Sequence, residues 1–208
     1  HTATFTADAT VSGNLASLSR NSTINTSQNA TITYDSGSNA GAQDGLSGSW
    51  SHTIGSGVNK ILAVSVAIGH NNASITISSI TYGGLSLTQI PGCAASLESG
   101  GLAAETEMWY LLNPDPGTGT ITVTLSGSPS DWTAAGVSYT GVAQTGTFRA
   151  TCNTETGLTG TNANLSVTSQ LGDLAIDAIT QIDSPNGLVV GAGQTQRQNQ
   201  VSGNTVGA

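Results

Sequence analysis

The chain has 208 residues, which is enough for one ordinary domain. Only 8% of its residues are charged, and four Lys and Arg stand against twelve Asp and Glu, for a net charge of −8. Because phosphate contacts need clustered cations, this composition argues against a nucleic-acid partner and against electrostatic binding to anionic lipid. No apolar run approaches the roughly 20 residues that a membrane-spanning helix needs, so no membrane span is expected.

The first segment with a clear pattern is residues 2–11, where apolar and polar residues alternate strictly. This period of two predicts a β-strand. Its apolar face consists of Ala3, Phe5, Ala7, Ala9 and Val11. Residues 12–28 lose the alternation and are rich in Ser, Asn and Thr, which is typical of a linker. We therefore predict an N-terminal strand at 1–11, a linker at 12–28 and a body at 29–208.

In the body, short strands and turns alternate with hardly a gap. Residues 60–69 are almost continuously apolar, which is typical of a central strand buried on both faces. Residues 94–107 are the one stretch compatible with a helix, and Ser99-Gly100-Gly101 interrupts it. Further strands are expected at 30–34, 46–54, 74–82, 85–89, 104–112, 118–126, 132–139, 164–169, 171–182 and 188–194. The pattern predicts an all-β fold, a two-sheet β-sandwich of jelly-roll type with a detached N-terminal strand.

The two cysteines, Cys93 and Cys152, lie in Gly-, Ser- and Thr-rich contexts that indicate loops. The chain begins at His1 without Met and is interpreted as a mature or trimmed secreted chain, so we expect an extracellular location. One cysteine pair in an extracellular chain predicts one disulfide, and two free thiols are the alternative. Two Cys without a nearby His pair lack the spacing of metal ligands, so neither a metal nor a cofactor is expected.

Five segments occur in a recognisable order along the body. They are Ser49-Trp50-Ser51-His52-Thr53, Asn59-Lys60-Ile61-Leu62-Ala63-Val64-Ser65-Val66, Ile80-Thr81-Tyr82-Gly83-Gly84, Met108-Trp109-Tyr110-Leu111 and Val137-Ser138-Tyr139-Thr140-Gly141-Val142. In this order the segments resemble secreted bacterial cell-surface and appendage β-sandwich modules, over about residues 30–195. The resemblance implies a building block of large secreted proteins, cell-surface or virion appendages, and it implies no catalytic residues.

The histidines give little indication of catalysis. His52 and His70 are the two internal ones, and no Gly-x-Ser-x-Gly elbow accompanies them. We therefore do not expect a Ser-His-Asp triad and interpret His52, beside Trp50, as a half-buried residue with satisfied hydrogen bonds.

Two pairs of carboxylates lie on predicted strands: Asp173 with Asp177, and Glu105 with Glu107. Such pairs could perform acid/base chemistry on a glycoside if a cleft brought them to the right separation. They could also bind Ca²⁺, although no Asp-x-Asp-x-Asp-Gly loop is present. The competing interpretation is a solvated strand face.

Aromatic residues and sequons suggest contacts with glycans. The candidates for stacking on a sugar are the three tryptophans and the tyrosines Tyr34, Tyr82, Tyr110 and Tyr139. Trp50 and Trp109 are predicted to lie in the core, whereas Trp132, at a strand entrance, is the best exposed candidate. Candidate N-glycosylation sites occur at Asn21, Asn25, Asn29, Asn72 and Asn164.

The expected function is that of a non-enzymatic extracellular structural subunit or module of a surface filament, appendage or virion. A ten-residue amphipathic strand must add to a sheet, so residues 2–11 are expected to pair with a neighbouring copy, head to tail, in a homo-oligomer. The alternative for this strand is that it folds back onto its own sheet. One alternative function is a carbohydrate-binding or adhesion module that uses Trp132 and neighbouring tyrosines. Another is a glycan-active enzyme that uses the paired carboxylates.

Overall fold

The fold is all-β, as predicted. The structure is a computed structural model that describes residues 2–10, 16–24, 31–71, 75–99, 102–129, 131–149, 152–156, 162–182, 189–202 and 205–207. All regular structure within these ranges is β-strand, and the strands form four sheets. None of the residues in these ranges belongs to a helix long and apolar enough to cross a membrane.

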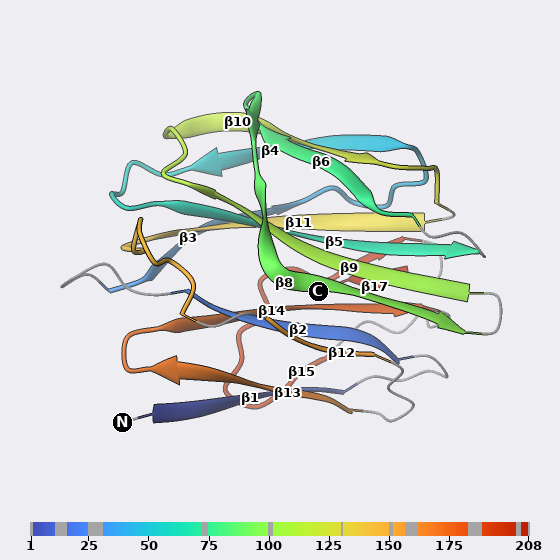
Figure 1. Cartoon of the computed structure of the whole chain (residues 1–208). Helices are drawn as coiled ribbons and strands as arrows, with labels where there is room; N and C mark the ends of the chain where they lie inside the picture. The colour runs from blue at the N-terminus through green and yellow to red at the C-terminus, as the bar shows by residue number, and fades with distance from the viewer. Residues whose placement is uncertain are drawn as a thin grey trace.

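A jelly roll of two facing sheets occupies residues 33–140 (Figure 1). Its strands are β3 (Thr33–Asn39), β4 (Ser47–Ile54), β5 (Ile61–Asn71), β6 (Ile77–Tyr82), β7 (Leu85–Ser86), β8 (Thr88–Ser99), β9 (Leu102–Leu112), β10 (Gly117–Leu125) and β11 (Asp131–Thr140). The outer sheet has the order β4-β10-β6-β7 and the middle sheet the order β3-β11-β5-β9-β8. Thus β3 pairs with β11, β4 with β10, β5 with β9 and β6 with β7. This nesting of early with late strands is the jelly-roll topology, which confirms the predicted sandwich.

The central strand of the middle sheet, β5, is covered on both faces. Its even-numbered residues, among them Leu62 and Val64, pack against the outer sheet, while Ile61 and Ala63 pack into a second core on the opposite side. A strand between two cores needs apolar residues at every position rather than at every second one. The prediction of a doubly buried central strand at 60–69 is therefore confirmed.

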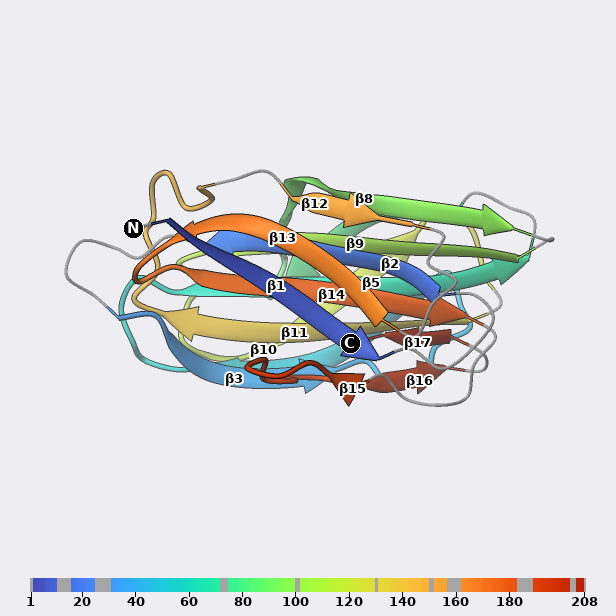
Figure 2. The same ribbon diagram turned by 90° about the horizontal axis from the view of Figure 1, so that it is seen from below.

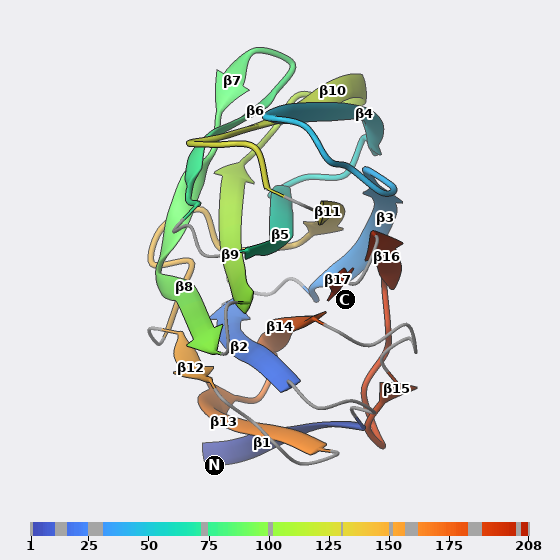
Figure 3. The same cartoon turned by 90° about the vertical axis from the view of Figure 1, so that its right-hand side faces the viewer.

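Two further sheets lie below the jelly roll, so that four layers are stacked (Figure 3). The third layer has the order β12-β2-β14-β17-β16 and the fourth the order β13-β1-β15. Their strands are β1 (Thr2–Thr10), β2 (Ala16–Ile24), β12 (Asn153–Glu155), β13 (Asn162–Gln170), β14 (Leu174–Ile182), β15 (Val189–Val190), β16 (Gln200–Ser202) and β17 (Thr205–Gly207). The body expected at 29–208 therefore holds more than one sandwich.

The predicted linker at 12–28 is wrong for residues 16–24, which form β2. This strand lies inside the third sheet, between β12 and β14. Its residues from Ser19 to Ile24 pair with Leu174–Ile179 of the apolar strand β14. Backbone hydrogen bonds need no apolar side chains, so a polar segment can complete a sheet when a neighbouring strand requires a partner.

Cys93 and Cys152 form a disulfide, which confirms the predicted pairing. Their Cα atoms are 5.1 Å apart, and 59 positions separate them in the sequence. Cys93 is fully buried and lies within β8, at a shift of the β8–β9 register, rather than in the expected loop. Because Cys152 directly precedes β12, the disulfide ties the middle sheet to the third layer.

Candidate functional site

The N-terminal strand β1 lies outside the jelly roll and pairs with β13 of the same chain (Figure 2). The antiparallel ladder runs without interruption from Thr2, opposite Gln170, to Thr10, opposite Asn162. The predicted apolar positions of β1 lie opposite the buried positions of β13. These pairs are Ala3 with Ser169, Phe5 with Val167, Ala7 with Leu165 and Ala9 with Ala163. Val11 lies outside the described residues.

This pairing is the alternative stated in the sequence analysis, in which the strand folds back onto a sheet of its own chain. It identifies β13 as the acceptor for residues 2–10. Five residues, 11–15, separate β1 from β2, and fully extended they can bridge roughly 20 Å. This reach is much shorter than the predicted seventeen-residue linker would allow.

A cavity of about 350 Å³ lies between the lower face of the middle sheet and β14. Residues 189–198 close one side of it. Part of the lining is aliphatic and comes from Ala63, Met108, Val137, Ile176 and Ile179. Polar groups from four segments of the chain complete it, among them Ser65, Tyr139, Asp177, Gln194 and Arg197. A cavity with an apolar floor and a few convergent polar groups is the usual form of a small-molecule site.

Asp177 is half-buried on β14 and lines this cavity. Burial raises the pKa of its carboxyl to about 6, and hydrogen bonds from its own backbone and from Gln194 counteract this only in part. The Nε2 atom of Gln194 donates to Oδ2 of Asp177 at 3.4 Å. Gln194 is itself held by the backbone amide of Gly191, which donates to its Oε1 at 2.9 Å.

Two tyrosines and an arginine stand beside the same cavity. The Cζ atom of Arg197 lies 4.0 Å from the ring centroid of Tyr34, a cation–π contact. The rings of Tyr34 and Tyr139 meet edge to face with centroids 5.9 Å apart. Burial raises the pKa of the Tyr139 hydroxyl, although the charge of Arg197 and a hydrogen bond from it oppose this rise. Arg197 is exposed, so the cavity reaches the surface beside it.

His52 lies in a buried polar network rather than in a triad. Its exposed fraction is 1%, so it is fully buried and not half-buried as expected. Ser38 Oγ lies 2.8 Å from Nδ1, and Ser36 Oγ lies 3.2 Å from Nε2. Burial lowers the pKa of His52, although the charge of Asp35 opposes this. The network ties β3 to β4 across the edge of the jelly roll.

The interpretation of a solvated carboxylate face is wrong for Glu105 and Glu107, which are 6% and 4% exposed on β9. This strand lies inside the middle sheet, so both of its faces are covered. Glu107 Oε2 accepts hydrogen bonds from Gln89 Nε2 at 2.6 Å and from Trp109 Nε1 at 2.8 Å. These contacts give Glu107 a structural role.

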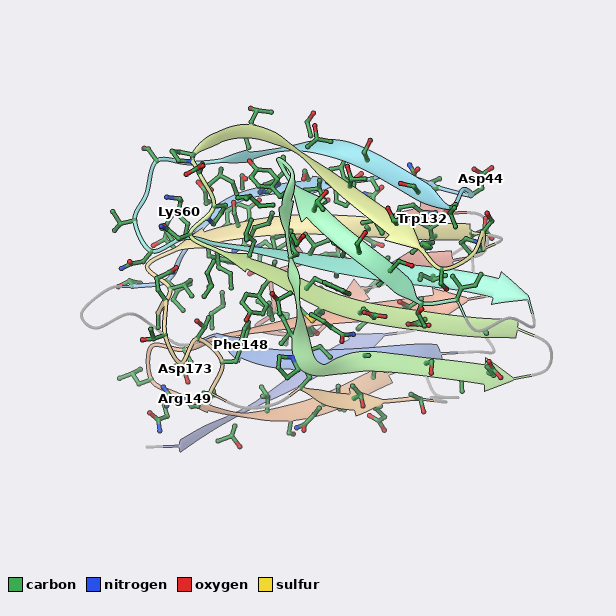
Figure 4. The ribbon with its side chains drawn as sticks, turned by 45° about the horizontal axis from the view of Figure 1, so that its top comes forward. Asp44, Lys60, Trp132, Phe148, Arg149 and Asp173 are labelled. Carbon is green, nitrogen blue, oxygen red and sulfur yellow. A yellow bond between two sulfur atoms is a disulfide. The ribbon has the colours of Figure 1, made fainter. Side chains whose placement is uncertain are left out.

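Asp173, the other carboxylate expected to share a face with Asp177, is engaged by Arg149. Figure 4 shows the two side chains facing each other, and the Arg149 Nε to Asp173 Oδ2 distance is 2.6 Å. The side chain of Asp173 is only 1% exposed, so it too is not solvated. Asp173 and Asp177 both line the cavity, but Asp177 lacks such an ion pair in the described part of the chain.

Trp132, the predicted sugar contact, is completely buried, so that prediction is wrong. Its Nε1 donates to the carbonyl of Gly45 at 2.8 Å, and its backbone pairs with Gln43. The start of β11, where the sequence suggested an exposed tryptophan, is covered by the segment around Gln43. Trp50 and Trp109 are partly buried against the core, as predicted.

Among the sequons, Asn164 lies at an exposed position on β13. Asn21 lies in β2, paired with Asp177 and Asn153. Asn25, Asn29 and Asn72 fall outside the residues that the structure describes. Among the residues that the structure does describe, no group of three or more His, Cys, Asp or Glu is placed to hold a metal ion.

No family model, curated protein or solved structure matches this chain. The residues at the cavity therefore have to be interpreted from their own geometry. Sequence reasoning singled out Asp177 as one of the paired carboxylates and Tyr34 and Tyr139 as aromatic candidates for a glycan contact, but it did not place them together. It missed Gln194 and Arg197. The one local signal is the run of amides around Arg197, Gln194-Thr195-Gln196-Arg197-Gln198.

Proposed function

We propose that this chain is a non-enzymatic extracellular structural module of a surface filament, appendage or virion, whose copies join by exchanging β1. The observation that carries the proposal is the uninterrupted register between β1 and β13. A terminal strand outside the jelly roll, held mainly by one acceptor strand, can leave that strand and pair with the same strand of a neighbour. The exchanged ladder would contain the same residue pairs as the ladder within one chain.

The energetics of such an exchange depend on the length of the connection between β1 and β2. Because the residue pairs are identical in both forms, the exchange gains or loses little contact energy, and the short connection at 11–15 sets the geometry. A connection of that length favours a neighbour whose β13 lies within roughly 20 Å. Two copies that exchange reciprocally form a closed dimer, whereas copies that each donate to the next form a filament.

The extracellular part of the proposal is supported by the disulfide and by the composition. A disulfide persists in oxidising compartments and is rare in the cytosol. A surface rich in hydroxyl and amide groups stays hydrated with only 8% charged residues.

Cross-linking between differently labelled copies tests the exchange. Thr4 lies opposite Thr168, so Thr4→Cys is introduced in one copy and Thr168→Cys in an isotopically heavy second copy. The two are unfolded and refolded together, and disulfides are then mapped by mass spectrometry. Light–heavy links between positions 4 and 168 are expected. The matched control pairs Thr4→Cys with Ser49→Cys, an exposed position on β4, and should give no links.

A second measurement concerns the deletion of residues 1–11. The shortened body is expected to be folded, monomeric and less stable, and a synthetic peptide of residues 1–11 should restore its stability. A full-length protein that stays monomeric at high concentration, with no links between copies, would contradict the proposed assembly.

A further inference from the structure

We infer that the cavity between β14 and the middle sheet binds a neutral saccharide unit, either a free monosaccharide or the terminal residue of a glycan. This site lies apart from Trp132, which is buried, and its test does not depend on whether copies exchange β1. The cavity volume of about 350 Å³ lies within the usual range of small-molecule sites. Voids larger than a water molecule are few in protein interiors, and the polar groups that line such a space are normally hydrogen-bonded to water or to a ligand.

The acceptor side of the site is Asp177. A carboxylate has about four acceptor positions. A bond from the backbone amide of Asp177 itself occupies one of them, and the Gln194 amide occupies another at 3.4 Å, a long distance for a hydrogen bond. Adjacent hydroxyl groups of a sugar can donate to the remaining positions. The raised pKa of Asp177 agrees with a carboxyl whose loss of water outweighs the two hydrogen bonds that it accepts.

The donor side of the site is formed by Arg197 and by the amide groups of Gln194 and Gln198. The Oε1 atom of Gln198 accepts a hydrogen bond from Asn39 Nδ2 at 3.0 Å, which fixes that side chain at the cavity wall. Sugar hydroxyls can accept from such groups while they donate to Asp177. A polyhydroxylated ligand therefore satisfies both kinds of partner.

The distribution of charge favours a neutral ligand. Asp177 and Arg197 line the same cavity. The carboxylate of Asp177 therefore repels an anionic ligand, and the guanidinium of Arg197 repels a cationic one. The aliphatic floor, including Met108 and Val137, offers a surface to the C–H groups of a sugar ring. The exposure of Arg197 and Thr195 leaves an opening through which the rest of a glycan can extend into solvent.

Saturation-transfer NMR with the full-length protein tests the inference. The probes are the methyl glycosides of glucose, galactose, mannose and N-acetylglucosamine, with ethanolamine and glycine as charged comparisons. Two variants alter the cavity: Asp177→Asn removes the acceptor, and Ala135→Met fills the space beside the middle sheet. The matched control is Asp44→Asn, which makes the same chemical change at an exposed residue far from Asp173 in Figure 4.

At least one glycoside is expected to bind the natural chain and Asp44→Asn equally. Asp177→Asn should weaken that binding at least tenfold, and Ala135→Met should abolish it, while both variants keep a cooperative thermal transition. The inference is overturned if no glycoside binds at millimolar concentration, if ethanolamine or glycine alone binds, or if both cavity variants bind as well as the control.

Discussion

Arg149 donates two hydrogen bonds to Asp173 at the turn where the chain passes from the fourth layer to the third. Nε donates to Oδ2 at 2.6 Å and Nη2 to Oδ1 at 3.1 Å, while the backbone amide of Gln170 donates to the same carboxylate at 2.8 Å. β13 and β14 are consecutive in the chain but belong to different sheets. The pair therefore holds a turn between layers that no ladder between these two strands supports.

Removing the arginine should destabilise this turn. In Arg149→Ala the carboxylate of Asp173, whose side chain is 1% exposed, loses its counter-ion. We expect the midpoint of thermal unfolding to fall by several degrees, because an unpaired buried charge is strongly unfavourable. Adding Asp173→Asn to Arg149→Ala should recover part of the loss. Equal and additive effects of the two single changes would show that the pair is not coupled.

The disulfide should contribute substantially to stability. Cys93 and Cys152 are 59 positions apart, and closing a loop of that length stabilises by about 4 kcal/mol in the chain-entropy treatment. The double variant Cys93→Ala/Cys152→Ala should therefore unfold at a clearly lower urea concentration than the natural chain. Two thiols that alkylate in the native, unreduced protein would refute the bond itself.

Asp177 should make the protein less stable as the pH rises. Its folded pKa of about 6 lies above the ordinary 3.8, so the folded state binds the proton more tightly than the unfolded chain between these values. The free energy of unfolding should fall by no more than about 3 kcal/mol as the pH rises from 4 to 6. Asp177→Asn should be the more stable protein at pH 7 and should match the natural chain near pH 4. A difference that does not depend on pH in urea unfolding would contradict this.

His52 should act in the opposite direction. Its folded pKa lies below the ordinary 6.5, so the unfolded chain binds the proton more readily and the histidine opposes folding as the pH falls below 6.5. His52→Gln should flatten this loss in urea unfolding between pH 6.5 and 5. At pH 7.5 the same change should destabilise the protein, because the bonds to Ser36 and Ser38 are replaced imperfectly. His70→Gln provides a control that changes the same residue type.

Local patterns were enough to predict the jelly roll. The continuous apolar run of β5 and the alternation of β10 follow directly from how many faces of each strand are buried. The polar strand β2 could not be found in this way, because its pairing is required by β14 and not by its own residues. Trp132 was misplaced for a similar reason, since its cover comes from Gln43, far away in the sequence.

The candidate binding site was harder to predict than the fold. Tyr34, Tyr139, Asp177 and Arg197 come from four separate segments, and each is unremarkable among its sequence neighbours. Their convergence depends on how the third layer packs beneath the middle sheet. No periodicity in the chain encodes that arrangement, because the cavity exists only between elements.

Val189 and Val190 contact both the N-terminal strand and the cavity. As β15 they pair with Thr10 and Ala9 of the N-terminal strand, and they also form part of the cavity wall. Because the same two residues contact both features, we expect occupancy of the cavity and the position of β1 to be thermodynamically linked, with an effect of equal size in each direction. In the proposed filament, β15 at the cavity wall of every internal subunit would pair with β1 of its neighbour. The subunit at the unpaired end would lack this pairing and would hold a sugar more weakly than all the others.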